Sequence, residues 1–153
     1  AATIQLGIGF TLTGNLALTA ATGSYVADGV VMLGSRITTS GGTKLIFTGS
    51  TNSLTNCIVD GQLDMETFGG AQIVSFGSFT LNSTLQLGSA SGSTSAQFYL
   101  RDSQTGTGTG TFVFGGNASN IFRGNGAPPT VTLPPVMASA PKPVPYLLFQ
   151  PSP

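Results

Sequence analysis

The chain has no histidine and no tryptophan, one cysteine, and only five acidic and five basic side chains among its 153 residues. A single cysteine excludes a disulfide within the chain, and without histidine nothing matches the ligand spacing of a zinc site. The apolar run around Cys57 predicts that its thiol is buried and unreactive. Since so few side chains could act as a tuned acid and base, the composition argues against an enzyme.

The low charge also limits the partners of this protein. Its formal net charge is zero, and its basic residues are dispersed along the chain: Arg36, Lys44, Arg101, Arg123 and Lys142. A nucleic-acid-binding face needs such residues clustered, so no nucleic-acid partner is expected. No apolar stretch approaches the roughly 20 residues of a membrane-spanning helix, so no membrane insertion is expected either. A weakly charged surface favours association between copies.

One compositional boundary divides the chain, because proline is absent before Pro128 and glycine is absent after Gly126. We therefore predict a Gly/Thr-rich β domain over residues 1–126 and an extended Pro-rich arm over residues 127–153. The β domain is large enough to bury a core without disulfides.

The first residues of the domain alternate strictly between apolar side chains at even positions and polar or small ones at odd positions, from Ile4 to Leu18. This period of two predicts β structure with one buried face. Around Gly14, the register favours either a three-residue hairpin turn over residues 13–15 or one long, bent strand.

Further strand-like runs are separated by turn residues, and no segment has the period of a helix; the runs are residues 25–33, 43–47, 54–59, 62–66, 71–76, 79–87, 96–101 and 111–114. Many short strands with turn signals between them predict an all-β fold, and we rank a single β-sandwich or jelly roll first. The loosely recurring apolar triplets of residues 43–87 are also typical of a short parallel β-helix. A solenoid should repeat at a constant length, and because we find no fixed period, the β-helix ranks second.

Three of the five acidic residues have the same parity in residues 60–66 and would share one side if the predicted strand 62–66 continued back through the Gly61 turn: Asp60, Asp64 and Glu66. Such a cluster suits calcium, which takes roughly six to eight oxygen ligands, and no other cofactor is expected. A pair of carboxylates can also serve glycoside hydrolysis. We favour a third interpretation, a solvated strand face, in which Leu63 and Met65 face the core and the exposed carboxylates pair with Arg36 or Lys44 across the sheet.

The arm combines a stiff spacer with an apolar end. Residues 141–145 alternate proline with lysine and valine, which predicts extended polyproline II structure. The next four residues contain no proline, so their backbone can add a strand to an open sheet edge. We predict docking on a neighbouring copy, through Val144, Tyr146, Leu147, Leu148 and Phe149. The alternative is an arm that folds back and covers an edge of its own body.

These features predict a non-enzymatic, self-assembling structural subunit of a virion surface, such as a decoration or fibre protein, or of an extracellular fibre. The expected location is the virion or the extracellular space, and the expected partners are copies of the chain and another shell or fibre protein. The alternative, from a different class, is a carbohydrate-binding or adhesive module whose exposed threonine, asparagine and aromatic side chains contact glycans.

Overall fold

The computed structural model describes residues 3–102, 104, 106–125 and 147–149, and within these residues all regular secondary structure is β. Every strand pair is parallel. Sandwiches and jelly rolls are built from antiparallel pairs, so the first-ranked fold is wrong. The described chain is instead a parallel β-solenoid of about five turns, which confirms the second-ranked β-helix.

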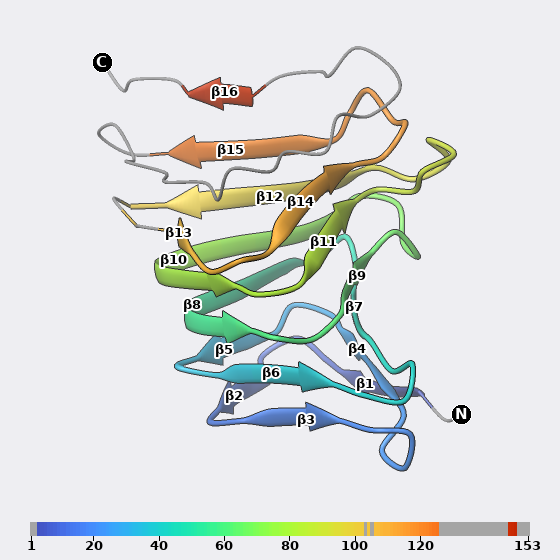
Figure 1. Ribbon diagram of the computed structural model, residues 1–153, viewed down its shortest axis with the longest axis vertical. Coiled ribbons are helices and arrows are strands. Elements are labelled where there is room, and N and C mark those ends of the chain that lie inside the picture. The colour runs from blue at the N-terminus through green and yellow to red at the C-terminus, as the bar shows by residue number, and fades with distance from the viewer. Residues whose placement is uncertain (1–2, 103, 105, 126–146, 150–153) are drawn as a thin grey trace.

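Each coil of the solenoid visits three faces in the same order (Figure 1). Face A, the six-stranded sheet, consists of β1 (Thr3–Leu6), β4 (Ser24–Ala27), β7 (Leu45–Phe47), β9 (Leu63–Met65), β11 (Thr84–Leu87) and β14 (Thr111–Phe114). Face B consists of β2 (Thr11–Thr13), β5 (Val31–Leu33), the first parts of β8 (Thr51–Val59) and β10 (Ala71–Leu81), and β12 (Ala96–Arg101), β15 (Ile121–Asn125) and β16 (Leu147–Phe149). Face C consists of β3 (Leu16–Leu18), β6 (Arg36–Thr39), the second parts of β8 and β10, and β13 (Gly106–Thr107).

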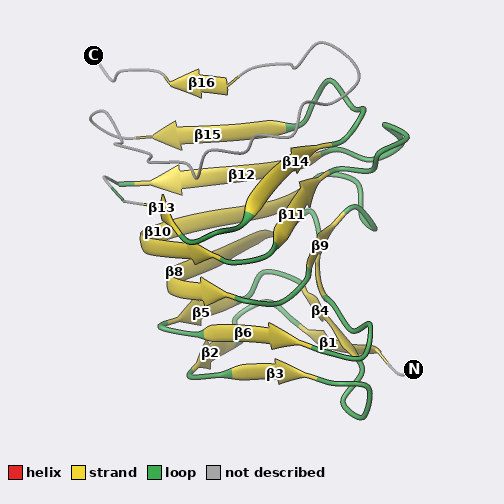
Figure 2. Ribbon diagram, in the orientation of Figure 1, coloured by secondary structure: helices red, strands yellow, loops and turns green. Residues whose placement is uncertain are grey.

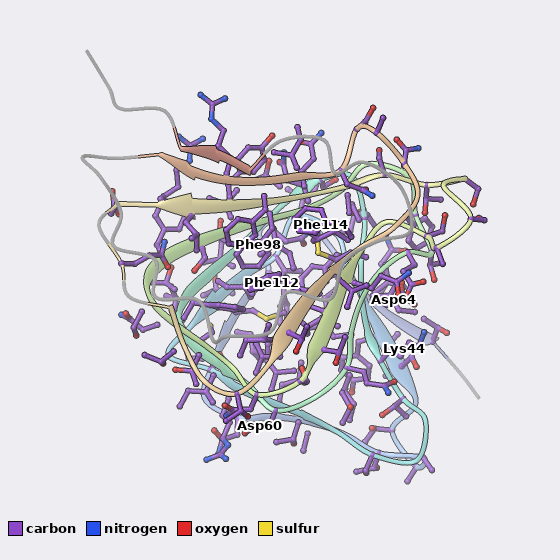
Figure 3. All side chains as sticks on the ribbon, turned by 45° about the horizontal axis from the view of Figure 1, so that its top comes forward. Lys44, Asp60, Asp64, Phe98, Phe112 and Phe114 are labelled. Atoms are coloured by element: carbon purple, nitrogen blue, oxygen red, sulfur yellow. The ribbon has the colours of Figure 1, made fainter. Side chains whose placement is uncertain are left out.

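The core lies inside the coils, where equivalent residues of successive coils stack in rows. One inward row of face A reads Ile4, Tyr25, Leu45, Leu63, Leu85 and Phe112. Toward the C-terminal coils the filling is aromatic, since the Phe98 ring contacts those of Phe79, Phe112 and Phe122 at centroid distances of 5.2–5.6 Å (Figure 3). Full burial of each such side chain contributes about 1.5–3 kcal/mol to folding, so these rows hold the coils together.

The corner between faces B and C requires a left-handed backbone in every coil. The residues at this corner have φ between 54° and 85° and stack above one another: Gly14, Gly34, Asn56, Gly77 and Asp102. Asn56 also links its coil to the next one, because its side-chain oxygen accepts a hydrogen bond from the backbone N–H of Ser78 at 2.9 Å. Figure 2 shows the loops at the corners between the stacked strands.

Several local predictions need correction. Of the two alternatives around Gly14, the hairpin over residues 13–15 is wrong and the bent strand describes the path better: β2 and β3 meet at the Gly14 corner and pair with β5 and β6 of the next coil. The predicted strand 25–33 is divided into β4 and β5, and the run 79–87 into β10 and β11, because a solenoid turns a corner within each run. Strands β6 and β15 were not predicted.

The absence of a fixed period agrees with the structure, but the assumption that a solenoid must repeat at a constant length, which ranked the β-helix second, does not hold here. Leu45 pairs with Leu63 but Thr84 pairs with Thr111, so the offset between successive coils ranges from 18 to 27 residues. What the coils preserve is the parallel register of the strands, while the corners absorb the differences in length.

Candidate functional site

Asp64 lies on the outer side of face A, yet its side chain is only 4% exposed. One carboxylate oxygen accepts hydrogen bonds from the backbone N–H groups of Glu66 (2.9 Å) and Thr67 (2.8 Å). The other accepts from the Thr67 hydroxyl (2.9 Å) and from the Lys44 ammonium (3.1 Å), which lies close to it in Figure 3. Burial raises the pKa of Asp64, but these hydrogen bonds outweigh it and hold the pKa below 3.8. Both oxygens are occupied, so this carboxylate anchors the turn after β9.

Asp60 belongs to a separate network, at the corner between faces C and A. It accepts hydrogen bonds from Asn82 in the next coil (2.7 Å) and from the guanidinium of Arg36 in the preceding coil. The Asn82 hydrogen bond and the Arg36 contact hold the pKa of Asp60 below 3.8 despite some desolvation. With their low pKa values, neither Asp60 nor Asp64 is suited to act as a general acid near neutral pH.

The third predicted calcium ligand, Glu66, accepts a hydrogen bond from Gln86 at 2.8 Å. The carboxylates of Asp60, Asp64 and Glu66 therefore serve three different networks. Among the described residues, no group of three acidic or cysteine side chains could hold a metal ion. The ion pairs of the favoured interpretation are present, since Arg36 contacts Asp60 and Lys44 contacts Asp64 across neighbouring coils, and Leu63 and Met65 lie in the core. Its solvated strand face is wrong at Asp64, whose side chain is buried.

The single cysteine is a core residue, as predicted. Cys57 is 1% exposed, and its thiol lies near the carbonyl oxygens of Met32 (3.6 Å) and Thr55 (3.5 Å). Burial raises the pKa of the Cys57 thiol above 9.0, which keeps it protonated and unreactive.

The end of the arm forms β16, which adds to face B as a parallel strand beside β15 of the same chain. Leu147, Leu148 and Phe149 pair there with Phe122, Arg123 and Gly124. The arm was predicted to dock on a sheet edge by adding a strand. Val144 and Tyr146 lie outside the described residues, and docking on a neighbouring copy stays a prediction.

The opposite end of the solenoid has an open surface. In the part of the chain that the structure describes, β1, β2 and β3 each pair on one side only, with the coil above. Large apolar side chains are exposed there: Ile4 is 44% exposed, Ile8 83% and Phe10 42%. The alternating pattern marks these residues as apolar, but it carries no signal of their exposure.

The outer side of face B carries a column of polar side chains. Thr51 donates to Gln72 at 2.6 Å, Gln72 donates to Gln97 at 3.1 Å, and the Tyr99 hydroxyl donates to the same Gln97 oxygen at 2.7 Å. These contacts link three coils. They also present amide and hydroxyl groups at the surface, where a polar ligand could reach them.

Within the described residues, no helix is long and apolar enough to cross a membrane. No protein-family model, no curated protein and no solved structure matches this chain.

Proposed function

We propose that this chain is a non-enzymatic, self-assembling structural subunit of a virion surface or of an extracellular fibre, and that its arm docks on a neighbouring copy. The observation that supports this proposal most directly is the β15–β16 pair, a short strand at the end of a long tether. Because neighbouring copies present the same β15 edge, a strand that can pair there in its own chain can also pair there in another, which is domain swapping.

The composition of the tether, residues 126–146, favours pairing of β16 with β15 of a neighbouring copy over pairing with β15 of its own chain. All but two of the nine prolines lie within residues 126–146, between β15 and β16. Proline fixes φ and favours polyproline II, which extends by about 3.1 Å per residue, so the sequence of this segment predicts a spacer, although these residues lie outside the described ones. Adjacent coils are only about 4.8 Å apart, and the spacer is long enough to reach well beyond its own solenoid.

The body of the molecule suits a structural role. Its rows of buried side chains stack from coil to coil, and its buried or partly buried aspartates, Asp28, Asp60 and Asp64, are engaged in contacts between coils. The low charge of the chain leaves little repulsion between copies.

The test compares the full chain with a chain that ends at Gly126, using light scattering at matched concentrations. We expect the full chain to have the larger mass in solution, with both chains giving the same β-type circular dichroism. A same-length chain in which residues 147–149 are serine should behave like the shortened chain, because it keeps the tether and loses the apolar strand. Lys142→Ala, within the tether, is the control and should leave the mass unchanged. Equal masses for the full and shortened chains would mean that β16 pairs with β15 of its own chain in solution. That result would refute the exchange of β16 between copies.

The polar column of face B favours a second candidate function, binding of a carbohydrate through Gln72, Gln97 and Tyr99. Amide groups beside an aromatic ring match the hydroxyl groups and apolar faces of sugars. Retention of the full chain on a glycan array, lost in Tyr99→Ala and kept in Lys142→Ala, would support this function.

A further inference from the structure

The outer side of face B differs in charge from the other two faces. Among the described residues, the strands of face B contain no acidic residue and two basic ones, Arg101 on β12 and Arg123 on β15. The other described cations, Arg36 and Lys44, each form an ion pair with an aspartate of a neighbouring coil. Face B therefore carries an excess of positive charge, on a chain whose formal net charge is zero.

Arg101 is exposed and lies on the same side of β12 as Gln97 and Tyr99. The two residues between these positions are buried in the core, and side chains alternate along a strand, so all three face outward. Within the described residues Arg101 forms no ion pair, although Asp102 follows it at the corner. Its guanidinium is thus open to a partner from solution.

The outward side chains of three adjacent strands form one surface, since β10 and β15 lie on either side of β12 (Figure 1). Gln97 is in register with Gln72 of β10, and Tyr99 is in register with Arg123 of β15. The Gln72 amide donates to Gln97 at 3.1 Å, and the Tyr99 hydroxyl donates to the same Gln97 oxygen at 2.7 Å. These five residues, with Arg101, are the β12 surface, in which hydrogen bonds already hold the ring and the amides in place.

The β12 surface combines three kinds of group that suit a sugar with an acidic substituent. Side-chain amides donate to and accept from hydroxyl groups, and an aromatic ring packs against the apolar face of a sugar ring. The planar fork of a guanidinium matches the two oxygens of a carboxylate. At about 3.3 Å per residue, positions 97 to 101 span about 13 Å, which accommodates more than one sugar ring.

We propose that the β12 surface binds an acidic polysaccharide, one whose sugars carry carboxylate groups, with the glycan lying along β12. Arg101 pairs with a carboxylate, Tyr99 packs against a sugar ring, and the two amides bond to hydroxyl groups. Charge selects this class of ligand. A neutral glycan leaves the Arg101 guanidinium in contact with water alone, whereas a carboxylate accepts two parallel hydrogen bonds from it. On face A the same ligand would meet the carboxylates of Asp64 and Glu66.

This inference rests on the carbohydrate-binding candidate and deepens it by naming the class of sugar and the role of Arg101. The two can fail separately. The glycan array and Tyr99→Ala test whether this face binds any sugar, whereas a pair of polymers that differ only in charge tests whether the sugar is acidic.

The probe is polygalacturonate, a linear polymer of carboxylated sugars, and its reference is the same polymer with its carboxylates converted to methyl esters. Each is titrated by calorimetry into the unchanged full chain and into Arg101→Gln. The matched control is Arg36→Gln, which removes the same charge from a 57% exposed arginine on face C. Because both arginines are exposed, neither change should disturb folding, and circular dichroism checks this.

We expect the unchanged chain to bind polygalacturonate more tightly than the ester. Arg101→Gln should weaken the binding of polygalacturonate by about 10-fold to 100-fold, because a hydrogen bond between charged groups is lost, and should leave the binding of the ester unchanged. Arg36→Gln should leave the binding of both polymers unchanged.

Three results would overturn the inference. Equal affinity for the two polymers, or no effect of Arg101→Gln, would exclude an acidic ligand held by Arg101 and leave the carbohydrate-binding candidate intact. Equal weakening in Arg101→Gln and Arg36→Gln would indicate diffuse attraction between the chain and a polyanion, with no site on face B. If neither polymer bound, the acidic class would be wrong, and the glycan array would decide separately whether this face binds sugars.

Discussion

Ile4 and Leu85 occupy the same inward row of face A, but their surroundings differ. Leu85 lies between Leu63 in the coil below and Phe112 in the coil above, and it is fully buried. Ile4 has only Tyr25 above it and remains 44% exposed. In a solenoid each repeat contacts only its neighbours, so this inward row is buried in the central coils and half-open at Ile4, whereas Leu16 and Leu18 of the same coil are buried on face C.

The two regions contribute differently to the stability of the chain. The central coils supply most of the stability, because their apolar side chains are removed from water on both sides. The first coil (residues 3–18) has the same alternating pattern, but Ile4, Ile8 and Phe10 stay 42–83% exposed among the described residues, so it contributes less buried apolar surface.

The largest expected difference between the two regions comes from the same substitution in each. Phe98 is fully buried among three other phenylalanine rings, whereas Phe10 is 42% exposed. We expect Phe98→Ala to lower the free energy of unfolding by about 3–5 kcal/mol, and Phe10→Ala by about 1 kcal/mol or less. Chemical denaturation followed by circular dichroism measures both, at a concentration where the chain is monomeric. Equal losses would mean that the first coil is as well packed as the centre.

A second test concerns the left-handed corner between faces B and C. Gly77 has φ 67°, and a Cβ atom there would collide with the Asn56 side-chain oxygen that holds Ser78. We expect Gly77→Ala to cost roughly 2–3 kcal/mol, from the left-handed backbone and the displaced hydrogen bond.

Gly7, in the first coil, is the matched control for Gly77. A Cβ atom at Gly7 meets nothing within 4 Å, and its φ is outside the left-handed region. Gly7→Ala should therefore be neutral or stabilise the chain by up to about 1 kcal/mol. A large loss in thermal stability at Gly7 would show that the first coil is more constrained than its exposure indicates.

The all-β class followed from the alternating residues, but the architecture depended on information that the pattern of single strands does not contain. Alternation in residues 4–18 specifies which side chains face inward, and it is the same whether the partner strand runs parallel or antiparallel. The sequence signal of the solenoid lies in the glycines that recur at one corner, and not in the apolar triplets. Glycines recur every 20 to 24 residues at the corner between faces A and B: Gly9, Gly29, Gly49, Gly70, Gly92 and Gly116.

The contacts of the candidate site were predictable in part. Opposite charges on neighbouring strands indicated the pairs of Arg36 and Lys44 with aspartates, and both exist. The burial of Asp64 was not predictable, because it depends on hydrogen bonds from the turn at Thr67. The exposure of Ile8 was not predictable either, since it follows from the position of the coil at an end of the stack.

The third test uses the pH dependence of Asp64. The pKa of Asp64 in the folded chain is below 3.8, so its stabilising effect is complete above the unfolded value and is lost as the pH falls through the folded value. We expect Asp64→Asn to cost about 1–2 kcal/mol at pH 7, because the amide loses the ion pair with Lys44 but keeps an acceptor for the backbone N–H groups.

Between pH 5 and pH 2, roughly, the free energy of unfolding should fall less in Asp64→Asn than in the unchanged chain. The remaining acid sensitivity comes from Asp28 and Asp60, whose pKa values are also lowered. Parallel pH curves for the two chains would show that Asp64 does not contribute to the loss of stability in acid.

The smallest expected effect belongs to the pair of Arg36 and Asp60, which has the same chemistry as the Lys44–Asp64 pair but a more open position. Arg36 is 57% exposed and Asp60 22%, compared with 4% for Asp64. Water and salt screen such a pair, so Arg36→Ala should cost only about 0.2–1 kcal/mol. In 1 M NaCl, where the Debye length is about 3 Å, this cost should nearly vanish, while the cost of Asp64→Asn should largely persist. Denaturation of both variants at low and high salt measures the difference. If salt reduced the cost of both substitutions equally, the two ion pairs would be equally open to water. The burial of Asp64 would then add nothing to its ion pair with Lys44.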